Sequence, residues 1–289
     1  MEKRKILIQL DSDPQPSVFD RVVAIDAGAD EVFAYGGVRP EQVQGLVHGA
    51  IFTRGRKDLK STALFVGGSD VGAGEKLLQE ARKHMIPQFG LEVSILLDAN
   101  GANTTAAAAV RAAARHLDLN GIPALVLGGT GPVGQRVARL LARAGAEVLV
   151  GSRQETRAAA VCAEIKARIP GSRLTPVATG TMPQLTEAMA GRVLVIAAGA
   201  ASAVLLPLAV RRTFSPKVAI DLNAVPPLGI EGIEATDKGT DRDGVICYGA
   251  LGVGDTKMKI HKAAIARLFE SNQHVLDAEE VFAIAQTLA

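Results

Sequence analysis

The sequence has no tryptophan and few other aromatic residues, with two tyrosines and eight phenylalanines among 289 residues. Proteins that bind single-stranded nucleic acid use aromatic side chains as stacking platforms for the bases. The formal net charge is only +2, so the protein as a whole has no strong field that would attract a polyanion. We therefore expect no nucleic-acid partner.

Cysteine is also scarce, because Cys162 and Cys247 are the only two in the chain. Two isolated cysteines provide neither a disulfide framework nor a metal site, and we expect both to be small buried side chains. The five histidines show no spacing typical of metal ligands, so we expect no metal. The apolar stretch near the N-terminus covers residues 6–10, far short of the roughly 20 residues of a membrane span. A cytoplasmic protein without a membrane anchor is expected.

Hydrophobic residues make up 48% of the chain, which is enough for the cores of two domains. Short apolar runs alternate with helical patterns, and this alternation predicts α/β domains. We expect two of them with an active-site cleft between them: a substrate domain of residues 1–105 with 270–289, and a Rossmann-type dinucleotide-binding domain of residues 106–269. The predicted strands are 6–10, 31–35, 50–53, 64–66, 93–97, 124–127, 148–150, 174–178, 193–197 and 218–222.

A glycine-rich turn follows the predicted strand at 124–127. Gly129, Gly131 and Gly134 fill the G-x-G-x-x-G spacing between that strand and a helical pattern. Glycines let the backbone approach a pyrophosphate, and a helix N-terminus presents N–H groups and the positive end of the helix dipole. A glycine turn before a helix is sometimes purely structural, but here strand, helix and second strand all lie where the fingerprint requires them. The turn therefore predicts a dinucleotide site.

Ser152, Arg153 and Arg157 follow the second strand of this unit. An NAD site usually has a carboxylate at this position for the ribose 2′-hydroxyl, whereas an NADP site has cations and hydroxyls for the 2′-phosphate. A guanidinium binds a phosphate with two hydrogen bonds. The alternative is that both arginines are solvated residues at the start of a helix. The pattern favours NADP and leaves NAD use open.

Other candidate ligand contacts follow predicted strands, where open α/β sheets bind their ligands. Phe19 and Asp20 open the helix after the first strand, although Asp20 equally suits the helix N-terminus. Asn100 and Asn103 have amides suited to a heterocycle, or to helix capping. In the predicted nucleotide domain, Ala198 and Gly199 are candidate contacts for the nicotinamide ribose, and Asn223 in a later loop is a further candidate contact for the nucleotide.

Several unusual strings are distributed along the whole chain. They are QLDSDPQPSVFD (9–20), LFVGGSD (64–70), LLDANGANTTAAA (96–108), LGGTGPVG (127–134), DLNAVPPLGIEGIEATDKG (221–239) and YGALGVGDTKMKIHKA (248–263). These strings resemble the bacterial methylene-tetrahydromethanopterin and methylene-tetrahydrofolate dehydrogenases of one-carbon metabolism. The resemblance implies reversible hydride transfer between a methylene-tetrahydropterin and NADP, and a homo-oligomer that is commonly a trimer.

The resemblance also assigns roles to individual residues. It implies a nucleotide loop of Thr130, Gly131, Pro132 and Val133, a 2′-phosphate site at Ser152, Arg153 and Arg157, a pterin site at Phe19, Asp20, Asn100 and Asn103, and an active-site lysine at Lys257. An ammonium beside a developing cation would oppose the reaction. We therefore expect Lys257 to contact the pterin carbonyl or another distal polar atom, or to be partly deprotonated. The preceding pair Asp255-Thr256 departs from the family pattern and leaves the orientation of this lysine open.

Three alternatives remain at this point. The one-carbon carrier is tetrahydromethanopterin or tetrahydrofolate. A shikimate-dehydrogenase-like NADP oxidoreductase would also have two α/β domains, but we find no convincing acid–base Lys/Asp pair for it. A non-catalytic NADP sensor would bind the nucleotide without turnover.

Overall fold

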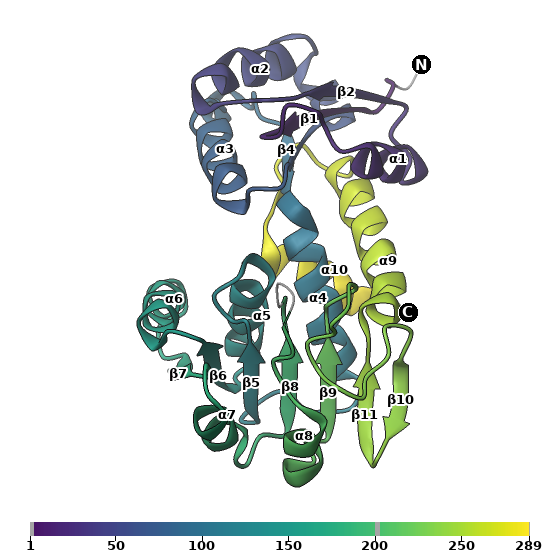
Figure 1. The fold of residues 1–289 in the computed structure, drawn as a ribbon. Helices are drawn as coiled ribbons and strands as arrows, with labels where there is room; N and C mark the ends of the chain where they lie inside the picture. Colours follow the sequence, from purple (N-terminus) through teal and green to yellow (C-terminus); the bar gives the residue numbers. More distant parts are fainter. Residues whose placement is uncertain (1–2, 200–202, 289) are drawn as a thin grey trace. The chain divides into compact units, whose positions relative to one another are not determined.

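The structure is a computed structural model that describes residues 3–199 and 203–288. The chain divides into two compact units, Met1–Thr104 with Met258–Ala289 and Thr105–Lys257 (Figure 1). Both boundaries fall inside helices, α4 (Ala102–Ala114) and α9 (Ala250–Leu268). The second boundary lies between Lys257 and Met258, whereas the sequence pattern predicts it between residues 269 and 270. Among the described residues, no helix combines the length and the apolarity needed to span a bilayer.

The first unit contains a five-stranded parallel sheet in the order β12-β4-β3-β1-β2. Its middle strand is buried at every position, as a parallel strand covered on both faces should be. The strands are β1 (Ile6–Asp11), β2 (Glu31–Tyr35), β3 (Thr62–Gly67), β4 (Ser94–Leu97) and β12 (Val275–Leu276). The helices are α1 (Val18–Asp26), α2 (Pro40–Phe52), α3 (Val71–Lys83) and α10 (Ala278–Thr287), with short 3₁₀ segments η1 (Arg56–Ser61), η2 (Pro87–Phe89) and η3 (Ala99–Gly101).

The prediction of a strand at residues 50–53 is wrong, because these residues form the end of α2 and its C-cap. Val43, Val47, Ala50 and Ile51 are all buried, and their spacing places them on one face of a helix. A short apolar run looks the same whether it ends a buried helix or forms a buried strand.

The apolar side of α1 faces outward. Val18, Val22 and Ile25 are 61%, 56% and 51% exposed, whereas Val23 and Ala24 on the opposite side are buried. Phe33 and Tyr35 of β2, an edge strand of the sheet, are also exposed. Val18, Val22 and Ile25 line a surface cavity together with Val32 of β2, and we call this exposed apolar patch the α1–β2 face.

The second unit contains a seven-stranded sheet in the order β10-β11-β9-β8-β5-β6-β7. All its strand pairs are parallel except the β10–β11 hairpin, which lies at one edge of the sheet, opposite β7 (Figure 1). The strands are β5 (Pro123–Leu127), β6 (Glu147–Ser152), β7 (Arg173–Ala178), β8 (Leu194–Ala197), β9 (Val218–Asp221), β10 (Lys238–Arg242) and β11 (Val245–Tyr248). The helices are α5 (Pro132–Arg143), α6 (Glu155–Arg168), α7 (Met182–Met189) and α8 (Leu208–Phe214).

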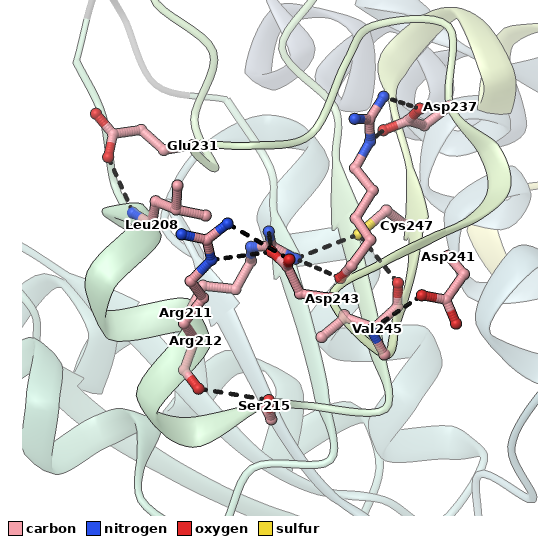
Figure 2. Close-up of polar contacts among 12 residues, drawn as sticks. Leu208, Arg211, Arg212, Ser215, Glu231, Asp237, Asp241, Asp243, Val245 and Cys247 are labelled. Carbon is pink, nitrogen blue, oxygen red and sulfur yellow. Dashed lines mark hydrogen bonds and ion pairs between the residues drawn. The ribbon is translucent and has the colours of Figure 1, made fainter.

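A buried arginine ties the β10–β11 hairpin to α8. Arg211 is 1% exposed, and its Nη atoms donate to Asp243 Oδ2 at 3.1 Å, to the Arg242 carbonyl at 3.2 Å and to Cys247 Sγ at 3.7 Å (Figure 2). Cys247 and Cys162 are both buried, as expected. Burial raises the pKa of both thiols, that of Cys247 to about 11, so both are protonated near neutral pH.

The same hairpin contains an ion pair whose removal should lower stability. Asp237 is 4% exposed and accepts hydrogen bonds from Arg242 Nε at 2.6 Å and Nη2 at 2.7 Å. Burial alone would raise the pKa of Asp237, but the hydrogen bonds from Arg242 and from the Glu234 N–H outweigh it and lower the pKa. We expect Asp237→Asn to reduce the free energy of unfolding by about 1–3 kcal/mol near pH 7.

The lowered pKa of Asp237 also determines how its contribution to the free energy of unfolding depends on pH. It is fully present above about pH 4, where the carboxyl group of the unfolded chain is ionised, and is lost as the pH falls through the lower folded-state pKa. Denaturant unfolding near pH 7 and pH 3.5 should therefore show a difference between wild type and Asp237→Asn that shrinks in acid. Glu234→Gln is the matched control, because Glu234 contacts the same arginine from an exposed position and should cost less than about 1 kcal/mol. Equal losses in the two variants would contradict the prediction.

Candidate active site

The glycine turn after β5 is packed so closely that side chains are excluded at Gly128, Gly129 and Gly134. A Cβ on Gly134 would lie 2.4 Å from the Gly128 carbonyl oxygen, and one on Gly129 would lie 2.7 Å from Val150 Cγ1. At Gly131 the nearest atom would be 3.4 Å away, which is an ordinary contact. Gly129 and Gly134 are thus required for packing, whereas the absence of a side chain at Gly131 leaves space above the loop.

The loop leads directly into the N-terminus of α5. Gly131 is the N-cap and Pro132 the first helical residue, so the cap residue has no side chain to accept a hydrogen bond from the first-turn N–H groups. Thr130 and Val133 flank this position and are partly exposed. An uncapped helix N-terminus beside a glycine loop is a ready-made anion site, so these residues fit a pyrophosphate. Gly128 at the start of the loop lies against the segment that follows β8, since the Gly199 carbonyl oxygen would be 2.7 Å from a Cβ on Gly128.

Ser152, Arg153 and Arg157 lie together at the carboxyl end of β6, as the sequence indicated. Ser152 is the last residue of the strand and is buried, and its Oγ accepts from the Gln154 N–H at 3.3 Å. Arg153 and Arg157 are exposed, and neither has an ion-pair partner among the described residues. Arg157 lies in the first turn of α6, where a cation opposes the helix dipole. A bound phosphate would relieve that unfavourable arrangement.

The order of the second sheet reverses between β5 and β8, and ligands of open α/β sheets bind at such a reversal. Ala198 and Gly199 follow β8, and the Ala198 N–H donates to the Leu127 carbonyl at the end of β5. Asn223 follows β9, where its N–H donates to Asp221 Oδ1 at 3.0 Å. Burial raises the pKa of Asp221 against the opposing effect of backbone N–H donors. The sequence-predicted nucleotide residues therefore gather at one edge of one sheet.

In the first unit, three loops at the carboxyl ends of β1, β3 and β4 are joined by hydrogen bonds. Ser69 donates from its N–H at 3.0 Å and from its Oγ at 2.8 Å to the carboxylate of Asp13. The Asn100 N–H donates to the Gly68 carbonyl at 2.6 Å. Gly68 itself has a φ of +106°, and a Cβ there would lie 2.0 Å from Ser12 Oγ. The loops thus form one connected edge rather than three independent segments.

The two predicted asparagines lie in different environments. Asn100 is exposed and adopts the left-handed conformation at φ 55°, which is uncommon outside glycine and is often found at functional sites. Asn103 is buried, and its amide donates to the Leu97 carbonyl at 2.6 Å and to Asp277 Oδ1 at 3.0 Å. Asn100 is therefore available to a ligand, whereas the amide donors of Asn103 connect α4 to β4 and to the start of α10.

Phe19 and Asp20 lie in the first turn of α1, where the Asp20 N–H donates to Oγ of the N-cap residue Ser17. They gather around a residue that sequence reasoning missed. His261 of α9 is 1% exposed, its ring stacks on Phe65 with centroids 5.8 Å apart, and its Nε2 lies 4.0 Å from Asp20 Oδ1. Phe19 lies 6.1 Å from the same ring, between centroids. In the sequence, the signal for His261 was its position four residues after Lys257 in a helical pattern.

Lys257 is partly buried on α9, and Lys259 is exposed. Residues four apart lie on the same face of a helix, so Lys257 and His261 share a face of α9. Within the described residues, no group of three or more His, Cys, Asp or Glu side chains has the arrangement of a metal site.

Comparison with known proteins identifies relatives along the whole chain. A family model described as "Methylene-tetrahydromethanopterin dehydrogenase, N-terminal" matches residues 18–100. Bifunctional protein MdtA of Methylorubrum extorquens is 45% identical over 289 residues, which cover 99% of each chain. The NAD(P)-dependent methylenetetrahydromethanopterin dehydrogenase of the same organism is 32% identical over 298 aligned positions, again 99% of each chain.

Solved structures with this fold include two dehydrogenases of another kind. Shikimate 5-dehydrogenase of Listeria monocytogenes aligns with a TM-score of 0.58 over 97% of this chain and 96% of its own, at 12% identity. Quinate dehydrogenase of Corynebacterium glutamicum aligns with a TM-score of 0.53 over 99% of each chain, at 14% identity. At such identities the similarity concerns the fold alone, a pair of α/β domains of which one is of the Rossmann type.

Proposed function

The chain belongs to the methylene-tetrahydromethanopterin dehydrogenase family, and on this premise we propose that it oxidises 5,10-methylene-tetrahydromethanopterin to the 5,10-methenyl form with NADP⁺. The observation that carries the proposal is the 32% identity, over 99% of both chains, to an enzyme named for this reaction and for NAD(P). The same reaction on methylene-tetrahydrofolate is the second candidate. The likeness to shikimate dehydrogenase supports no activity, because it extends only to the fold.

The residues at the reversal of the second sheet fit NADP⁺. Gly131 and the first turn of α5 would hold the pyrophosphate, and Arg153 and Arg157 would hold the 2′-phosphate. Ala198, Gly199 and Asn223 follow the neighbouring strands and would surround the nicotinamide ribose. When bound, NADP⁺ supplies the hydride acceptor.

The substrate chemistry explains why the chain needs no array of acids and bases. The methylene carbon lies between two nitrogens, whose lone pairs stabilise the cation left by hydride loss, so no proton must be removed. The protein's work is to position the substrate and to exclude water that would hydrolyse the cationic product. The negative charge of Asp20 would stabilise the cationic methenyl product. Its carboxylate would also accept hydrogen bonds from the amino and ring N–H groups of the pterin.

Three further residues complete the proposed substrate site. Phe19 offers an exposed ring for stacking, and Asn100 offers an exposed amide for the edge of the heterocycle. Lys257 would contact a pterin carbonyl or another polar atom away from the reacting carbon, since an ammonium near the cation would oppose its formation. His261 would hold Asp20 and Phe19 in position rather than bind substrate directly, because it is almost entirely buried.

A spectrophotometric assay tests the proposal by measuring the reduction of NADP⁺ and of NAD⁺ with each of the two carriers, methylene-tetrahydromethanopterin and methylene-tetrahydrofolate. We expect reduction of NADP⁺ with methylene-tetrahydromethanopterin at the highest kcat/KM of the four combinations. A higher value with methylene-tetrahydrofolate would favour the second candidate. Nucleotide binding without turnover on either carrier would make the protein a sensor and contradict the proposal.

The cofactor preference should depend on Arg153. Arg153→Gln is expected to lower kcat/KM with NADP⁺ about tenfold, because a charged hydrogen-bond pair to the 2′-phosphate is lost, and to leave the value with NAD⁺ unchanged. Steady-state kinetics with both nucleotides measures the ratio. Arg168→Gln, at the other end of α6, is the matched control and should change neither value. A similar decrease with NAD⁺ would assign Arg153 to another role.

We also propose that the protein is a homo-oligomer, as the family resemblance implies, and that the α1–β2 face is buried in the oligomer. Val18, Val22 and Ile25 line a surface cavity of about 440 Å³ together with Val32, Arg21 and Asp26. A second copy of the chain that covers this face would remove its apolar side chains from water. Light scattering after gel filtration should give an oligomer for wild type and a smaller species for Val22→Asp. An unchanged mass for Val22→Asp would exclude this face as the interface.

A further inference from the structure

A second surface cavity lies in the Rossmann-type unit, at the amino ends of β6 and β7, and has a volume of about 240 Å³. Its lining includes three cations, Lys166 from α6, Arg173 from β7 and Arg192 from the segment before β8. The lining has one carboxylate, Glu147 at the start of β6. The cavity therefore has two positive charges in excess.

The single carboxylate is already paired. Glu147 and Arg173 are register partners in the sheet, and Arg173 Nη1 lies 3.2 Å from Glu147 Oε1. Arg173 Nη2 also donates to the Gly145 carbonyl, so its guanidinium is held at both ends. Neither Lys166 nor Arg192 has an ion-pair partner among the described residues. Their charges are consequently available to a ligand.

The same lining contains a buried hydroxyl group, that of Ser172, which directly precedes β7. Ser172 Oγ is shielded from solvent and has no hydrogen-bond partner among the described residues. Arg192 Nε donates to the Ala190 carbonyl at 3.1 Å, which anchors that side chain beside the cavity. Two guanidinium groups with fixed contacts, one ammonium and one hydroxyl make a donor set with the chemistry of a phosphate site.

The cavity is separate from the proposed nucleotide site. Glu147 begins β6 and Ser152 ends it, so the cavity and the candidate 2′-phosphate site lie at opposite ends of the same six-residue strand. A strand of that length spans roughly 17 Å. One phosphate group therefore cannot occupy both sites.

We propose that this cavity binds a phosphate or pyrophosphate group of a small molecule. The excess charge, the fixed guanidinium groups and the unpaired hydroxyl all call for an anionic ligand with several acceptor oxygens. The site lies in the nucleotide unit, at the opposite end of β6 from the residues proposed to hold the 2′-phosphate of the nucleotide.

Isothermal titration of pyrophosphate into the full chain at low ionic strength and saturating NADP⁺ tests the proposal. NADP⁺ occupies the glycine loop, and we expect a remaining site whose Kd rises about tenfold in Arg192→Ala and in Lys166→Ala. Arg168→Ala removes a neighbouring cation of α6 that does not line the cavity and should leave the Kd unchanged. A parallel titration of inorganic phosphate distinguishes a single-phosphate from a diphosphate ligand, and tighter binding of either one supports the proposal.

Circular dichroism and thermal unfolding establish that the variants are folded. The proposal is overturned if wild type shows no binding at millimolar pyrophosphate. It is also overturned if folded Arg192→Ala and Lys166→Ala both bind as wild type does.

Discussion

Gly134→Ala is expected to weaken NADP⁺ binding about 100-fold. The new Cβ would lie 2.4 Å from the Gly128 carbonyl oxygen and close to the Gly129 Cα, which are backbone atoms of the loop itself. The loop cannot relieve this contact by rotating a side chain, so the start of α5 must move away from β5. A displacement of about 1 Å in a binding or catalytic group commonly costs two orders of magnitude.

Isothermal titration with NADP⁺ measures the effect. Gly49→Ala is the matched control, because a Cβ on this α2 residue would meet nothing within 4 Å. That substitution should leave the Kd unchanged and stabilise the protein slightly, since alanine is favoured over glycine inside a helix. Wild-type affinity in a folded Gly134→Ala variant would show that the glycine turn does not hold the nucleotide.

Lys257→Ala and Asp20→Ala are each expected to lower kcat/KM for the methylene-pterin about 100-fold while NADP⁺ binding persists. Each variant removes a charged group that we assign to the substrate rather than to the nucleotide, and the loss of such a group from an active site costs about this much. The residues lie on different helices, α9 and α1, so a common effect would indicate a common ligand.

Steady-state kinetics and nucleotide titration together separate substrate from nucleotide effects. Lys259→Ala is the control for Lys257→Ala, since it removes the same charge from the same helix and should change kcat/KM less than about threefold. Near-normal turnover in Lys257→Ala or Asp20→Ala would remove that residue from the site. A parallel rise in the Kd for NADP⁺ would assign it to the nucleotide instead.

Much of the fold follows from local pattern. The strand, glycine turn and helix around Gly134 were predicted because each part has its own signal: an apolar run, a glycine spacing and a helical periodicity. The start of α9 has no local signal, because Gly249, Gly252 and Gly254 are typical of a loop. A Cβ on Gly252 would lie 1.8 Å from the Asp237 carbonyl oxygen, so glycine is needed there for a long-range contact. No local pattern reports such a contact.

The sequence by itself determined the class of the protein and the nucleotide it favours. The glycine spacing, the arginines after β6 and the strings around Asp20, Asn100 and Lys257 are local features, and local features are readable along a chain. The tertiary structure decided which of these side chains are exposed and which hold the fold. It buried Asn103 against Asp277, exposed Asn100, placed His261 beside Asp20, and gathered three cations around Ser172. These outcomes depend on contacts between residues far apart in the chain, and such contacts exist only after the sheets have formed.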